Sequence, residues 1–130
     1  PCDCFIFNSE TSKFFCFELT STQSKSITFE NIESTEKQNR MIHKHQIISL
    51  SKYSEFKNVI SGFIFNFRDE KSGIERTYFQ NIDDFICMIK EIKKCSFNEK
   101  DLLLHNPIII PGIKKRINFN WDLRVLLEPK

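Results

Sequence analysis

The chain has 130 residues, the size of a single folded domain. Forty per cent of the residues are hydrophobic, fourteen are Phe, and the formal net charge is only +2. This composition is sufficient for a packed core. It excludes a protein that attracts polyanions through its overall charge, so any nucleic-acid surface must be local.

The ends of the chain and its cysteines bear on its cellular location. The first residues do not form a basic and apolar leader, and no apolar run approaches the ~20 residues of a membrane helix, so we expect a cytoplasmic protein. Because the chain begins without Met inside a strand-like run, we expect upstream residues to precede it. The five Cys residues show no framework spacing and no C-x-x-C knuckle, which favours reduced thiols over disulfides or zinc.

The first half of the chain predicts a hairpin followed by a helix. Two apolar and aromatic runs, 2–7 and 13–19, flank the polar cluster NSETS and predict antiparallel strands joined by a turn. The segment SITFENI predicts a short extended piece. The segment from about Ser34 to Phe56 contains no Gly or Pro, and residues recur at helical spacing from Ile42 through Tyr53 to Phe56, which predicts one long amphipathic helix.

The second half predicts another hairpin and a second helix. The run 58–68, NVISGFIFNFR, is too apolar for a surface strand and predicts a central one, with IERTYFQ as its antiparallel partner. NIDDFICMIKEIKK predicts a helix with one apolar stripe. The tail predicts a short helix at NEKDLLLHN, the apolar segment PIIIPG, a short strand and a helical turn from Trp121. This order predicts one α/β or α+β domain over residues 1–130.

The first hairpin is expected to hold two carboxylates face to face. A turn centred after Glu10 sets Asp3 opposite Glu18, and side chains paired in this way lie ~4.5–5.5 Å apart at Cβ. Carboxylates held so close repel each other unless a cation neutralises them, and Mg²⁺ prefers a few carboxylates with several waters. The pair predicts a Mg²⁺ site that admits a phosphate oxygen. A pair of solvated acids on an edge hairpin is the alternative.

Several segments carry a family resemblance: PCDCFIFNSETSKFFCFELTSTQSKSITFENI, HKHQIISL, GFIFNFRDEKSGIERTYFQNIDDF and KKRINFNWDLRVLL. In this order they resemble the PD-(D/E)xK nucleases, and within them the RecU-type Holliday junction resolvases and their phage relatives. The resemblance covers nearly the whole chain; the D…ExK motif alone would be weak. It implies a restriction-endonuclease-like core, with a mixed central β-sheet flanked by helices. The family also has an N-terminal helix, which we expect upstream of this chain.

The resemblance implies Mg²⁺-dependent cleavage of branched DNA by a homodimer, with Mn²⁺ as a substitute metal. Asp3 and Glu18 take the metal-ligand positions, and Gln46 takes the helix position near the catalytic centre. Thr20 stands where the family has lysine, so Lys25 on the following Ser/Thr-rich stretch becomes a candidate stand-in. Two alternatives remain: a nuclease-fold DNA-binding protein with weakened or lost catalysis, and a restriction or repair nuclease of the same fold.

Positive residues and a histidine complete the set of DNA-binding candidates. They are Lys25, Lys44, His45, Lys114, Lys115 and Arg116. Lys and Arg contact backbone phosphates without reading sequence, although a solvated loop is the alternative for the run 114–116. His45 would contact DNA or a metal-bound water, unless it is an ordinary surface histidine. On the predicted helix, His43 and His45 lie roughly 200° apart and would not share one metal.

Overall fold

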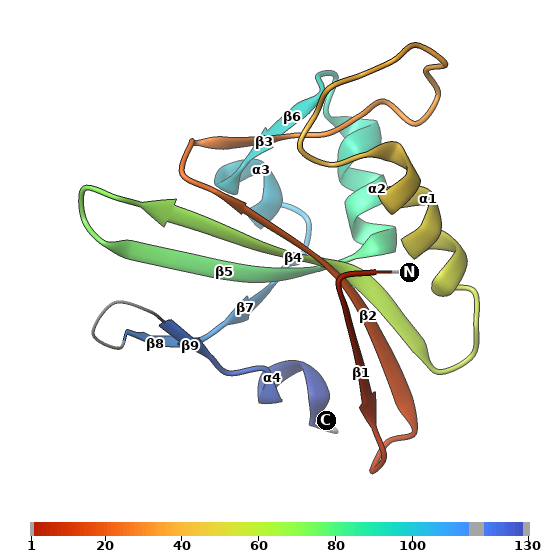
Figure 1. Ribbon diagram of the computed structural model, residues 1–130, viewed down its shortest axis with the longest axis vertical. Helices are drawn as coiled ribbons and strands as arrows, with labels where there is room; N and C mark the ends of the chain where they lie inside the picture. The colour runs from red at the N-terminus through yellow and green to blue at the C-terminus, as the bar shows by residue number, and fades with distance from the viewer. Residues whose placement is uncertain (1, 115–118, 129–130) are drawn as a thin grey trace.

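A five-stranded mixed sheet forms the centre of the computed structural model, which describes residues 2–114 and 119–128 (Figure 1). In spatial order the strands are β1 (Cys4–Asn8), β2 (Lys13–Thr22), β4 (Val59–Asp69), β5 (Ile74–Asn81) and β7 (Ile108–Ile110). β2 and β4 are parallel, and the other neighbouring strands are antiparallel. The mixed sheet with flanking helices confirms the predicted α/β class.

Within the described residues, four helices and two small ribbons surround this sheet. The helices are α1 (Lys44–Tyr53), α2 (Ile82–Glu91), α3 (Glu99–Leu103) and α4 (Arg124–Leu127). The ribbons pair β3 (Ser26–Thr28) with β6 (Ser96–Asn98), and β8 (Gly112–Lys114) with β9 (Phe119–Trp121). α1 and α2 lie on one side of the sheet and α4 on the other (Figure 1). In the described part of the chain, no helix is both long and apolar enough to span a bilayer.

Aromatic side chains fill the core on both faces of the sheet. On the side of α1 and α2, Phe63 of β4 packs on Phe85 of α2 with ring centroids 4.6 Å apart. On the opposite side, Phe17 of β2 meets Phe79 of β5 at 5.3 Å. β4 stands third of the five strands, and because both faces are covered its residues are buried or half-buried from Val59 to Phe67. The prediction of a central strand over this segment is therefore confirmed.

The hairpin of β1 and β2 has the register that the sequence predicts. Cys4 pairs with Phe17 and Asn8 pairs with Lys13, so the next step along the ladder sets Asp3 opposite Glu18. Alternation along β2 directs Glu18 to the sheet face that carries α1, because its neighbour Phe17 belongs to the core of the other face. The hairpin thus brings the two acids to one face, at the edge of the helical layer.

The long helix predicted from Ser34 is wrong at its start, because α1 begins only at Lys44. The preceding segment returns alongside the end of β3, where the Ile42 N–H donates to the Thr28 carbonyl at 3.0 Å. The Met41 N–H donates to the hydroxyl of the same threonine at 3.0 Å. Hydrogen bonds to a neighbouring segment replace helical ones here, and the polar run 34–40 provides no apolar stripe that could pack a helix against the core.

Candidate active site

Asp3 and Glu18 meet at the edge of the sheet, next to the start of α1. Asp3 directly precedes β1 and is exposed, whereas Glu18 lies in the middle of β2 with only 5 % of its surface exposed. The Leu19 backbone N–H donates to Asp3 Oδ2 at 2.9 Å. This bond holds the Asp3 carboxylate against β2, so one acid of the pair is buried and its partner faces solvent.

The environment of Glu18 opposes a free negative charge. Burial is the largest cause that raises its pKa, and the hydrogen bond and charge of Asp3 raise it further, to about 7. The contact with Gln46 acts in the opposite direction and is smaller. A carboxylate pair of this kind favours a bound proton or another cation, because either one relieves the repulsion between the two acids. The pair therefore favours a protonated Glu18, or a cation that takes the place of the proton between the two acids.

Gln46 lies in the first turns of α1 and contacts Glu18 directly. Its Nε2 donates to Glu18 Oε2 at 3.0 Å, and its Oε1 accepts from the His43 backbone N–H at 2.8 Å. A backbone N–H can only donate, so the carboxamide oxygen must face His43 and the amide nitrogen must face Glu18. Gln46 consequently orients the Glu18 carboxylate and does not offer its oxygen as a metal ligand.

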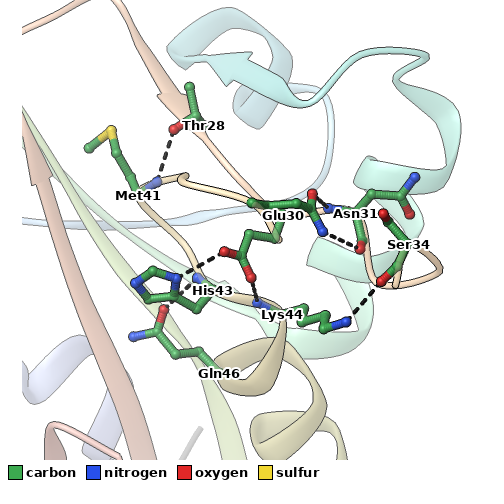
Figure 2. A network of polar contacts seen from close by, with 9 residues as sticks. Thr28, Glu30, Asn31, Ser34, Met41, His43, Lys44 and Gln46 are labelled. Carbon is green, nitrogen blue, oxygen red and sulfur yellow. Dashed lines mark hydrogen bonds and ion pairs between the residues drawn. The ribbon is translucent and has the colours of Figure 1, made fainter. Parts of the chain in front are cut away.

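A buried carboxylate anchors the helix end that carries Gln46 (Figure 2). Glu30 Oε1 accepts from the Lys44 backbone N–H at 2.9 Å, and its Oε2 lies 3.1 Å from His43 Nδ1. The Lys44 N–H, followed by the His43 side chain, holds the pKa of Glu30 below its ordinary value. Sequence analysis missed Glu30, because no short-range sequence pattern links it to His43 and Lys44.

The two histidines near this helix end are neighbours, contrary to the prediction. The rings of His43 and His45 stack with centroids 5.5 Å apart and planes at 7°. The predicted separation of roughly 200° around a helix fails because His43 is the N-cap residue, with extended backbone at φ −85° and ψ 145°. His45 is exposed, and the structure gives no contact between it and the acid pair.

The donor set at the acid pair fits Mg²⁺ better than a softer metal. Within residues 2–114 and 119–128, no three His, Cys, Asp or Glu side chains gather as a metal-binding group. The chain therefore offers two hard carboxylates, and water and a phosphate oxygen would supply the remaining ligands. Mg²⁺ is bound in this way at many phosphate-transfer sites, whereas zinc sites use sets of Cys and His.

The structure places Thr20 near the pair but does not bring Lys25 there. Thr20 is partly buried on the same face of β2 as Glu18. β2 continues to Thr22, ~13 Å along the strand from Glu18 at the usual rise per residue. Lys25 follows in the turn between β2 and β3, at the opposite end of the strand from the hairpin, and lines a groove together with Arg76 (Figure 1). Lys25 therefore does not place its ammonium at position 20, where the family resemblance implies a lysine.

Of the remaining DNA-binding candidates, Lys44 and His45 are neighbours on the first turn of α1. Lys44 Nζ donates to a carbonyl of the preceding loop at 2.8 Å, so this ammonium braces the loop beside α1. His45 is exposed on the first turn of α1. Lys114 ends β8, but its side chain lies outside the part of the chain that the structure describes, as do Lys115 and Arg116. The predicted basic cluster at 114–116 is thus untested.

Comparison with known proteins finds a relative to which no activity is assigned. No protein-family model matches the chain. The chain is similar to YotM of Bacillus subtilis strain 168, an SPbeta prophage-derived uncharacterized protein, with 30% identity over 135 residues. The similarity covers 95% of this chain and 63% of the relative, so the chain spans less than two thirds of that protein. The name of the relative records a prophage origin and assigns no activity.

Proposed function

We propose that this chain is a metal-dependent endodeoxyribonuclease of the PD-(D/E)xK type, selective for branched DNA and resembling RecU-type resolvases. One observation supports the proposal above the others. Asp3 and Glu18 meet across the hairpin, and Gln46 of α1 donates to Glu18. Two facing carboxylates with a helix glutamine correspond to the constellation that the resemblance implies, on a mixed sheet flanked by helices.

Each residue at the site would have a separate role in phosphodiester hydrolysis. Bound Mg²⁺, with Mn²⁺ as its substitute, would supply a Lewis acid that polarises the scissile phosphate and lowers the pKa of a water. Asp3 and Glu18 would hold the ion, with the exposed Asp3 on the side open to DNA. Gln46 keeps one Glu18 oxygen in a fixed place. Thr20 points to the same face but carries no charge, so we expect slower chemistry than with lysine there.

The protein would act as a homodimer on four-way junctions in the bacterial cytoplasm. Phe5, Phe7 and Phe14 on the β1–β2 hairpin are 53%, 53% and 47% exposed, and this apolar surface would suit a second copy of the chain. The prophage origin of the similar protein supports a role in phage DNA recombination or repair. Lys25, Lys44, His45 and the segment 114–116 are the proposed phosphate contacts.

A non-catalytic DNA-binding protein of the same fold is the second candidate, and Thr20 is the observation that favours it. Incubation of the protein with a four-way junction and a linear duplex, in Mg²⁺ or Mn²⁺, separates the possibilities. The proposal predicts metal-dependent cleavage of the junction and little cleavage of the duplex. Junction binding without any cleavage would support the non-catalytic candidate. Equal cleavage of both substrates would support a restriction or repair nuclease.

A further inference from the structure

We propose that Glu30 is a positioning residue for the Asp3–Glu18 pair, acting through the first turn of α1 and Gln46. The proposal rests on the proposed function in assigning a metal to the pair. The contacts through which Glu30 acts are independent of that function. Glu30 would touch neither the metal nor DNA, and its effect would reach Glu18 only through the glutamine.

Glu30 is fixed at both its backbone and its side chain. Its backbone N–H donates to the Ile42 carbonyl at 2.9 Å, which holds the residue against the chain just before α1. Its two carboxylate oxygens contact the Lys44 N–H and the His43 ring, at 2.9 Å and 3.1 Å. The negative charge of this carboxylate, placed next to the N-terminus of α1, also interacts favourably with the helix dipole. Glu30 thereby fixes where α1 begins.

The start of α1 in turn fixes Gln46. The N–H of His43 is the group to which the Gln46 carboxamide oxygen is bound, and His43 is the residue whose ring Glu30 holds. Figure 2 shows Glu30, His43, Lys44 and Gln46 as one connected network. A displacement of His43 would therefore turn the carboxamide and move the donor that contacts Glu18. In this way a carboxylate next to β3 controls the orientation of an acid on β2.

The burial of Glu30 argues for a specific role beyond capping. Its side chain is only 10% exposed, and a buried carboxylate is costly unless its hydrogen bonds are complete. A helix cap by itself needs only a short side chain such as Ser or Asn at the N-cap position. Here the N-cap residue is His43, and the acceptor comes from a separate segment that packs on the core through Phe29. The arrangement ties the helix to the sheet layer.

Glu30→Ala tests this chain of contacts, with Glu33→Ala, an exposed acid of the same loop, as the matched control. We expect Glu30→Ala to shift the side-chain amide NMR signals of Gln46 and to weaken Mn²⁺ binding about 10- to 100-fold, the usual range for groups that orient metal ligands. Gln46→Ala should weaken Mn²⁺ binding by a similar factor. The double variant Glu30→Ala/Gln46→Ala should be no weaker than Gln46→Ala alone, because Glu30 acts through Gln46.

Three results would overturn the proposal: unchanged Gln46 signals in Glu30→Ala, an equal loss in Glu33→Ala, or additive losses in the double variant. If Glu30→Ala fails to fold, Glu30→Gln replaces it, since it keeps one acceptor for the Lys44 N–H but loses the carboxylate that holds His43. If the wild-type chain binds no Mn²⁺ while the Gln46 signals still shift, the positioning role stands and the proposed function fails.

Discussion

Asp3 Oδ2 accepts a hydrogen bond from the backbone N–H of Leu19, the residue that follows Glu18, at 2.9 Å. An exposed acid at the end of a strand would ordinarily rotate freely in solvent. This bond instead keeps the Asp3 carboxylate beside Glu18, where its charge helps to raise the Glu18 pKa to about 7. The part of the Glu18 pKa shift that comes from Asp3 therefore depends on one backbone contact.

Asp3→Asn should lower the pKa of Glu18 without returning it to the ordinary value. The substitution removes the charge of Asp3, but burial remains the largest cause of the shift. An NMR pH titration of the Glu18 carboxyl carbon measures the change directly. Glu10→Gln, on the exposed hairpin turn, serves as the control and should have no effect. An unchanged Glu18 pKa in Asp3→Asn would show that the two acids do not interact.

Glu18 should make the protein less stable as the pH rises from about 4.5 to about 7. Its pKa moves from an ordinary 4.5 to about 7, so in this window the folded chain keeps a proton that the unfolded chain has released. The free energy of unfolding must therefore fall across the window and level off above it. Urea denaturation at several pH values should show this slope for the wild type and a shallower one for Glu18→Gln. Equal slopes would contradict the burial of Glu18.

Thr20→Lys should raise the rate of junction cleavage about a hundredfold, the usual contribution of one charged or hydrogen-bonding group to a transition state. The position lies on the face of β2 that carries Glu18, so a lysine there would direct its ammonium toward the acid pair. Leu19→Lys is the matched control, because the adjacent residue points to the opposite face and should give no gain. Equal rates in Thr20→Lys and the wild type would mean that the site lacks more than a lysine.

Gly62→Ala should destabilise the fold by about 1–3 kcal/mol, the usual cost of overpacking a core. A Cβ at this position in β4 would lie 2.1 Å from the carbonyl oxygen of Gln80 and 2.9 Å from the Phe79 ring. The neighbouring backbone of β5 cannot yield without breaking the strand pairing. Chemical denaturation measures the change. Gly73→Asn, at a turn with φ 69°, is the control and should cost little. A stable Gly62→Ala protein would indicate looser packing between β4 and β5.

The hairpin and the central strand were predictable because their signals are local. Two apolar and aromatic runs flank a polar turn, and the position of that turn sets the register that places Asp3 opposite Glu18. The mostly apolar stretch from Val59 to Phe67 in β4 required cover on both sheet faces, and the structure provides it. Gln46 was expected near the catalytic centre from the family resemblance, and the structure places it against Glu18.

The start of α1 was not predictable because its determinants are distant in sequence. No Gly or Pro separates the polar run 34–40 from α1, but Met41 and Ile42 form hydrogen bonds to Thr28 at the end of β3 and not to helical partners. His is an uncommon N-cap residue, so the pair His43 and Gln46 carried no recognisable capping pattern. The role of Glu30 at the start of α1 can be recognised only from its tertiary contacts with His43 and Lys44. The stacking of His43 and His45 was missed for the same reason, because the predicted helix began too early and included His43.

The most direct measurement is the position at which Mn²⁺ binds, because the proposed nuclease requires its metal at the acid pair. Paramagnetic broadening of backbone amide signals at low Mn²⁺ concentration locates the ion in solution. We predict that broadening centres on Asp3, Leu19 and Gln46 and is lost in Glu18→Gln. Broadening centred elsewhere in the chain, or signals that Mn²⁺ leaves unchanged, would contradict a metal-dependent nuclease site at this pair.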